Sequence, residues 1–240
     1  MLPSTTPIHK LPGITFLANA HPDFALVFQA LGGSPVGGGL FDGNPPSSLE
    51  SLLSGTTEGL LQDAISRADL ICVDVGHGTG HAIEDATTLV SRLFPNTFPR
   101  DTRHVLVDLA AAGEDIHPAH LQALLALSES LQSHAEVTLA LAPGTRPGNG
   151  QSLRSLRQQL GVSEVLLLDS QTLASSTGKG DSQCALESGE KDVPCPTVLA
   201  TYAATQFLNL PQESRLHFAA KAGQLHLSGG SAPSWIEIQS

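Results

Sequence analysis

Short apolar runs recur along the chain, and each is followed by a turn and then by a stretch with helical spacing. The apolar residues of a run are consecutive rather than alternating, which is typical of a strand buried on both faces. Alternation of such strands with helices predicts right-handed crossovers between parallel neighbours. We therefore predict an α/β fold with three layers, in which helices cover both faces of a mostly parallel sheet of at least five strands. The predicted strands are Ile14–Ala20, Leu70–Val75, His104–Ala110, Val137–Ala142 and Val165–Ser170.

Two regions interrupt this alternation. Gly37–Gly59 is rich in glycine and proline, and Ser170–Pro196 is polar, which is typical of an excursion or a short hairpin. The length of 240 residues fits one α/β domain, residues 1–240, with loop-rich excursions at about 37–59 and 170–196. Beyond the second excursion the pattern predicts helices at Thr197–Leu208 and Glu213–Ala222, a strand-like end at Gln224–Gly229, and Trp235 as an anchor for the tail.

The composition excludes several classes of partner. The formal net charge is −11, and no stretch of clustered lysine and arginine is present, so we expect neither nucleic acid nor anionic lipid as a partner. No apolar run approaches the roughly 20 residues of a membrane span, which predicts no membrane insertion and a cytoplasmic location. Cys72 falls in an apolar strand and is expected in the core, whereas Cys184 and Cys195 could pair only in an oxidising compartment, a question that stays open.

Acidic residues follow the predicted strands where a ligand is expected. In an open parallel sheet, ligands bind outside the carboxyl ends of the strands. Asp74 and Asp108 lie at two such ends, and clustered carboxylates there can hold a divalent cation or act as bases. We predict Asp74, His77 and Asp108 as catalytic residues, with Asp74 and Asp108 as metal ligands. The alternative is that a strand-end aspartate caps the following helix.

Two glycine-rich loops follow predicted strands and are candidates for binding a cofactor. GHGTG (Gly76–Gly80) lets the backbone approach a ligand closely, and APGTRPGNG (Ala142–Gly150) holds an arginine whose planar fork suits phosphate or carboxylate. A solvated arginine is the alternative for the second loop. The predicted cofactor-binding residues are Asn19, Gly76, Gly78, Thr79, Gly144, Thr145 and Arg146.

The order of these segments resembles the ribokinase-like superfamily, in particular the hydroxyethylthiazole kinases. ANAHPDFALVFQALGGSPV (Ala18–Val36) is similar to that family's opening Asn segment and helix, and ADLICVDVGHGT (Ala68–Thr79) to its strand ending in Asn-Ile-Gly-Thr. HVLVDLAAAG (His104–Gly113) and VTLALAPGT (Val137–Thr145) correspond to two further strands, so the resemblance covers about 14–208. It implies a small-molecule kinase that uses ATP and Mg²⁺, with Asp74 and Asp108 near the metal and substrate and Arg146 on phosphate.

The chain departs from this family at the loop that binds the transferred phosphate. The family has Gly-Thr-Gly-Cys or Gly-Ala-Gly-Asp at the start of a late helix, whereas this chain reads DVPCPTVLATYAATQFL (Asp192–Leu208), with Cys195 near the expected place. The Asn-x-x-Glu motif is absent as well. Because phosphoryl transfer depends on such positioning, the resemblance predicts an atypical or degenerate phosphate loop. A catalytically inactive protein acting through protein contacts is therefore the alternative function, and a hydrolase using His77 and Asp74 is a further one.

A second resemblance, to the MinD/ParA-like ATPases, is carried by GLFDGNPPSSLESLLSG (Gly39–Gly55) and by LICVDVGHGTG (Leu70–Gly80). Those ATPases need a G-x-x-x-x-G-K-[ST] loop after the first strand, where this chain reads LANAHPDF (Leu17–Phe24), so an active P-loop is excluded. The segment Gly37–Ser48, with Leu40 and Phe41, is expected to pack across an interface, so we predict a homo-oligomer or a protein partner beside a small-molecule ligand.

Overall fold

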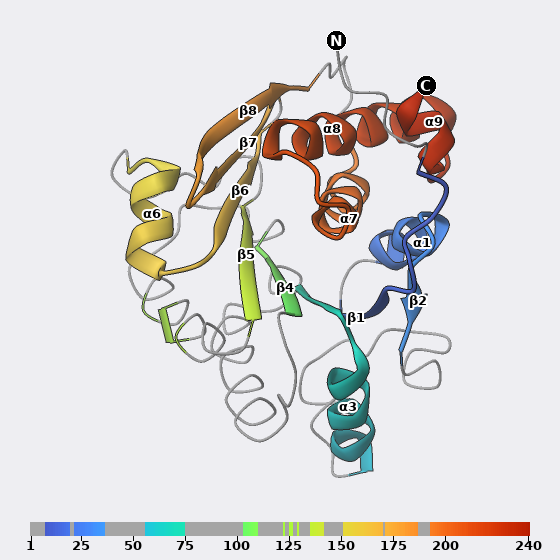
Figure 1. Ribbon diagram of the computed structural model, residues 1–240, viewed down its shortest axis with the longest axis vertical. Helices are drawn as coiled ribbons and strands as arrows, with labels where there is room; N and C mark the ends of the chain where they lie inside the picture. Colours follow the sequence, from blue (N-terminus) through green and yellow to red (C-terminus); the bar gives the residue numbers. More distant parts are fainter. Residues whose placement is uncertain are drawn as a thin grey trace.

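A mixed β-sheet forms the centre of the computed structural model (Figure 1). The structure describes residues 8–19, 22–36, 56–74, 103–109, 135–141, 151–169, 171–186 and 193–240, together with helical positions 122, 125, 126 and 129. The strands within these ranges are β1 (Thr15–Asn19), β2 (Ser34–Pro35), β3 (Leu70–Asp74), β4 (Arg103–Asp108), β5 (Ala135–Leu141), β6 (Glu164–Leu168), β7 (Thr172–Thr177) and β8 (Gly180–Ala185). They lie side by side in the order β2-β1-β3-β4-β5-β6-β7-β8.

The first six strands of this order are parallel, and β7 and β8 add an antiparallel edge. All five predicted strands are present, as β1, β3, β4, β5 and β6, so the predicted α/β class with a mostly parallel sheet is confirmed. Within the stretch 170–196, Gly178 and Lys179 join β7 to β8 in a tight hairpin that pairs with β6. The polar alternation of β8 reflects its place at the edge, where one face is exposed.

Helices lie on both sides of the sheet (Figure 1). α1 (Pro22–Ala30), α7 (Cys195–Gln206) and α8 (Gln212–Gly229) gather on one side, while α3 (Thr56–Arg67) and α6 (Leu153–Leu160) lie on the other. Ser152 caps α6 by accepting from the Ser155 N–H, and Gly161 ends it with φ 65°, a conformation that favours glycine. Within the described residues, no helix is both long and apolar enough to span a membrane.

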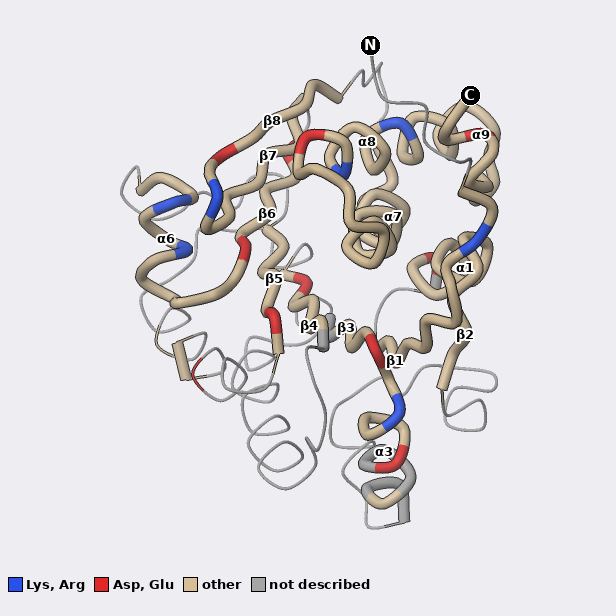
Figure 2. Tube along the Cα trace, viewed as in Figure 1, with Lys and Arg blue, Asp and Glu red and all other residues tan. Residues whose placement is uncertain are grey.

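α7 is the central helix of its layer. Every residue from Thr197 to Thr205 is buried, and the helix carries no charged residue (Figure 2). A helix that is apolar or small all round must be covered on all sides, and α7 packs against α1 and α8. α8 packs tightly here at Gly223, where an added Cβ would lie 2.2 Å from Cγ1 of Val193, just before α7, and 2.7 Å from Cγ2 of Val198 in α7.

The C-terminal segment closes the fold against its beginning. Trp235 is 1% exposed, and its indole N–H donates to the Leu31 carbonyl at 2.7 Å, which confirms its predicted role as an anchor. Trp235 opens the short helix α9 (Trp235–Gln239), whose capping box joins Ser234 and Glu237. The predicted strand at Gln224–Gly229 is wrong, because α8 continues to Gly229. Its buried stripe of Leu216, Ala219, Ala220 and Gly223 has helical spacing, which overrides the local alternation of QLHLSG.

All three cysteines lie in the described part of the chain, and no disulfide joins Cys184 to Cys195. Cys72 is 1% exposed and belongs to the core, as expected for a small apolar side chain in a buried strand. Burial raises the pKa of the Cys184 thiol, so that side chain stays protonated at neutral pH.

Candidate functional site

The carboxyl ends of β1, β3 and β4 meet at one edge of the sheet. In the strand register, Asn19 lies opposite Val73, and Asp74 lies opposite Asp108. Neighbouring strands are about 4.8 Å apart, so the backbone positions of the two predicted metal ligands are adjacent. Asp108 is half-buried at this edge; of Asn19 and Asp74 the structure describes the backbone. The sheet thus brings together three predicted site positions that are far apart in sequence.

The other predicted site residues lie outside the described residues. These are His77, Gly76, Gly78 and Thr79 in the first loop, and Gly144, Thr145 and Arg146 in the second. The segment Gly37–Ser48 with the predicted interface residues lies outside them too. Among the described residues, no group of three histidine, cysteine, aspartate or glutamate side chains could hold a metal ion.

Helix α7 begins at Cys195, in the segment that was compared above with the phosphate loop of the ribokinase-like superfamily. Its last residue, Gln206, donates to Thr138 Oγ1 at 2.8 Å and to Glu164 Oε2 at 3.4 Å, near the beginning of β5 and β6. A helix of 12 residues is roughly 18 Å long, close to the length of a strand. From this length we infer that the first turn of α7 lies toward the carboxyl end of the sheet.

The first turn of α7 offers few groups to an anion. Pro194 is the N-cap and makes no side-chain capping bond, and Pro196 in the first turn has no N–H to donate. The Thr197 hydroxyl is fully buried and is hydrogen-bonded to His226 Nδ1. Val193 and Val198 pack onto Gly223, so the space beside the turn is filled by apolar side chains. A glycine-lined phosphate cradle would need open space and free N–H groups at this place.

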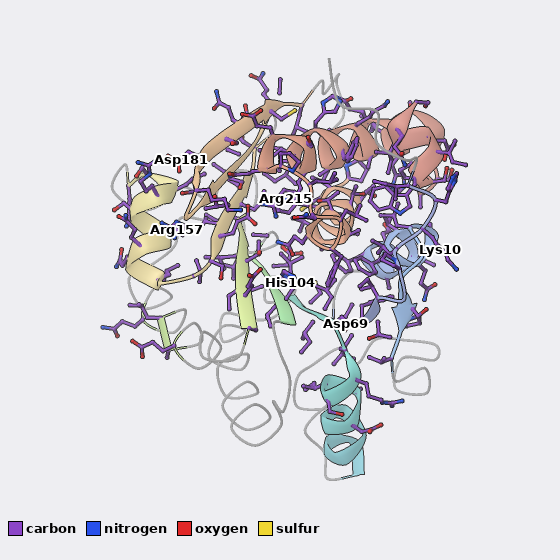
Figure 3. The ribbon with its side chains drawn as sticks, in the orientation of Figure 1. Lys10, Asp69, His104, Arg157, Asp181 and Arg215 are labelled. Carbon is purple, nitrogen blue, oxygen red and sulfur yellow. The ribbon has the colours of Figure 1, made fainter. Side chains whose placement is uncertain are left out.

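A cavity of about 680 Å³, lined mostly by polar and charged residues, lies at the opposite, amino-terminal edge of the sheet. Its lining includes residues near the start of three strands, His104 of β4, Glu136 of β5 and Glu164 of β6, together with Gln212 and Arg215 of α8 (Figure 3). His104 lies opposite Glu136 in the register, and Thr138 lies opposite Glu164. Sequence reasoning missed this site, although the glutamate at the start of the apolar run EVLLL was a signal.

Glu164 is 4% exposed and lies at the centre of a hydrogen-bond network beside this cavity. Its Oε1 accepts hydrogen bonds from the hydroxyls of Ser175 and Tyr202. Arg215 approaches Glu164 Oε2 with its NH1 group at 3.6 Å and lies 5.3 Å from the centre of the Tyr202 ring. Burial, and then the neighbouring Glu164 carboxylate, raise the pKa of Tyr202 well above its usual value. The phenol therefore stays protonated and serves as a donor.

His104 is neutral at neutral pH. Burial lowers its pKa below 6.5, and the nearby Arg215 acts in the same direction, against the opposing effect of Glu136 at 3.4 Å. The His104 ring also packs edge-on against Phe207, with 4.8 Å between ring centres. These contacts hold the imidazole as a neutral part of the cavity wall.

Comparison with solved structures shows which known fold this chain resembles. No protein-family model matches the sequence, and no curated protein matches it. Among solved structures, the pyridoxal kinase from Staphylococcus aureus in complex with pyridoxal has a TM-score of 0.56 at 13% identity, over 93% of this chain and 93% of that chain. A protein assigned as a phosphomethylpyrimidine kinase from Bacteroides thetaiotaomicron has a TM-score of 0.54 at 10% identity, over 96% and 88%.

A third similar structure is that of a protein assigned as ribokinase II from E. coli, with a TM-score of 0.53 at 13% identity. The match covers 76% of this chain, and this chain spans 60% of that one. The fold of this chain is therefore that of the ribokinase-like kinases, and the predicted resemblance to that superfamily is confirmed at the level of fold. Fold alone leaves the activity to be argued from the site.

Proposed function

We propose that this chain is a catalytically inactive relative of the ribokinase-like kinases, which binds a small molecule at the carboxyl edge of its sheet and does not transfer phosphate to it. The observation that carries the proposal is the first turn of α7. Val193 and Val198 fill the space beside it, and Pro196 removes a donor. Phosphoryl transfer needs donors and cations arranged around the moving phosphate. The residues at the first turn of α7 do not fit a phosphate group that is being transferred.

The edge itself remains suited to ligand binding. The half-buried Asp108 and the neighbouring backbone positions of Asn19 and Asp74 come from three adjacent strands, where open α/β sheets bind their ligands. The acidic pair would be the residues to hold Mg²⁺ if the cation is bound, since carboxylate oxygen is its preferred ligand. A protein partner that contacts Gly37–Ser48 belongs to the same proposal, because an inactive relative would act by binding another protein.

The second candidate is a small-molecule kinase that uses ATP and Mg²⁺ with a degenerate phosphate loop. The register of Asp74 opposite Asp108 favours it, because two carboxylates at one strand edge suit a metal that neutralises phosphate. In this case Arg146, Gly144 and Thr145 would contact the nucleotide, with Gly76, Gly78 and Thr79 on the other loop. A hydrolase using His77 and Asp74 is the remaining alternative.

One experiment separates the inactive relative from the small-molecule kinase. The purified chain is incubated with ATP and Mg²⁺ together with pyridoxal or hydroxyethylthiazole, and phosphorylated product is measured by mass spectrometry. We expect no product above the protein-free control. Product formation that Asp108→Asn abolishes, while the matched control Asp63→Asn leaves it unchanged, would establish the kinase instead. Asp63 is a suitable control because it is exposed on α3 and pairs with Arg67.

Ligand binding is measured separately by thermal unfolding with the same compounds. A ligand present at a hundredfold its Kd stabilises a protein by about 2.7 kcal/mol. We expect stabilisation by one of these compounds that Asp108→Asn reduces and Asp63→Asn retains. If no compound of the panel shifts the unfolding temperature, binding at the carboxyl edge is refuted for these ligand classes.

A further inference from the structure

The cavity at the amino-terminal edge is separate from the site proposed above. Its walls come from the beginning of β4, β5 and β6, the β7–β8 turn, the end of α7 and the first turn of α8. A five-residue strand is roughly 17 Å long, and about that distance separates Glu164 from the carboxyl edge. The two sites therefore lie at opposite ends of the strands, and the kinase-like site does not use this cavity.

Two charged atoms beside the cavity lack close partners. Glu164 Oε2 has its nearest donors at 3.4 Å, from Gln206, and at 3.6 Å, from Arg215, although a charge-assisted hydrogen bond is typically about 2.7–2.9 Å. Arg215 Nε is buried and has no hydrogen-bond partner among the described residues. Glu164 and Arg215 both line the cavity, so a carboxylate and a guanidinium with incomplete pairing belong to the same wall. Buried charged groups of this kind favour a further partner.

The lining carries charges of both signs, with three carboxylates and two cations. Arg215 and Lys179 are cationic, whereas Glu136, Glu164 and Glu213 are anionic, and His104 is neutral. The three carboxylates disfavour an anion, and the two cations disfavour a polyamine. Much of the remaining wall consists of hydroxyl and amide side chains, which hydrogen-bond a polar ligand. A molecule that carries both charges and no net charge matches this wall.

We propose that the cavity binds a small zwitterion of the α-amino-acid class. Its ammonium group would donate to Glu164 Oε2 and Glu136, and its carboxylate would accept from the Arg215 guanidinium and from Lys179, which both line the cavity. The volume of about 680 Å³ lies within the range of small-molecule pockets, about 300–1,000 Å³. Because Gln206 ends α7 and Gln212 begins α8, the ligand would contact both helices.

Isothermal titration calorimetry of the full chain without nucleotide tests the proposal, with L-serine and L-glutamine as probes. Ribose, inorganic phosphate and putrescine serve as polyol, anion and cation controls. Arg215→Lys keeps the charge beside Glu164 but removes the unpaired N–H, and we expect it to weaken binding about tenfold or more. Gly178→Tyr adds a bulky side chain at the lining, where a new Cβ meets nothing within 4 Å, so the fold is retained while the cavity is obstructed.

The matched control is Gly229→Tyr at the end of α8, where an added Cβ also meets nothing within 4 Å. We expect this variant and Asp108→Asn to bind the amino acid as the wild type does, which separates this site from the carboxyl edge. The proposal is overturned if neither amino acid binds, if ribose, phosphate or putrescine binds as well as they do, or if binding is unchanged in both Arg215→Lys and Gly178→Tyr. Circular dichroism of each variant establishes that it is folded, and Gly178→Tyr provides the test if Arg215→Lys is not.

Discussion

The contact between α7 and α8 at Gly223 gives the sharpest test of the packing that fills the first turn of α7. Gly223→Ala places a Cβ 2.2 Å from Val193 Cγ1 and 2.7 Å from Val198 Cγ2. Both separations are well inside the roughly 3.5–4.0 Å at which carbon atoms pack. Alanine gains about 1 kcal/mol of helix propensity over glycine, whereas overpacking in a tight core costs about 1–3 kcal/mol and occasionally more.

The overpacking exceeds the propensity gain because two side chains must move and Val198 is fully buried in α7. We expect Gly223→Ala to lower the free energy of unfolding by about 1–2 kcal/mol, measured by urea denaturation followed by circular dichroism. Gly59→Ala is the matched control, because it lies inside α3 and its new Cβ meets nothing within 4 Å. That variant should be stabilised by a few tenths to about 1 kcal/mol.

A double variant identifies the cause. Val193→Ala removes the methyl group nearest to the new Cβ, so Gly223→Ala should cost less in the Val193→Ala background than in the wild type. If Gly223→Ala is as stable as Gly59→Ala, or if the two substitutions are additive, the valine side chains do not fill the space beside the first turn of α7. The space beside the first turn of α7 would then be open to a phosphate group.

Three further predictions concern buried polar groups. Trp235→Phe should lower the free energy of unfolding by about 1–2 kcal/mol in urea, because it leaves the Leu31 carbonyl without its indole donor; an unchanged midpoint would refute the anchor. Tyr202→Phe removes a donor to the buried Glu164 carboxylate and should cost about 1.5–3 kcal/mol by the same assay, whereas a neutral result would mean that water replaces the phenol. Since burial lowers the pKa of His104 in the folded state, its contribution to stability is present above its unfolded pKa near 6.5 and is lost as the pH falls below that value. Urea denaturation between pH 7 and 5 should show this loss and His104→Gln should reduce it; an identical slope in the variant would contradict the assignment.

The parallel strands and the position of the carboxyl edge could be predicted from the amino-acid sequence. A strand buried on both faces must be apolar at consecutive positions. Five segments can be recognised as such strands from their residues alone: ITFLA, LICV, HVLV, VTLAL and VLLL. The position of Asp74 and Asp108 follows from the same logic, because a polar residue that ends such a run is delivered to the edge of the sheet. The sequence also shows that this chain lacks, before α7, the glycines that the ribokinase-like kinases carry in their phosphate loop.

The packing of α7 against α8 and the lining of the amino-terminal cavity could not be predicted from the sequence and are seen only in the folded structure. The sequence gives no sign that Gly223 matters for packing; the folded structure shows that Val193 and Val198 lie against it. The Gln224–Gly229 segment alternates locally like a strand, yet it is helical because α8 buries a stripe against α7. His104, Glu164 and Arg215 are separated along the chain by strands, a hairpin and a helix, and no short-range pattern relates them. Their proximity follows from the order of the strands and from the path of α7 across the sheet, and both depend on long-range packing rather than on local sequence.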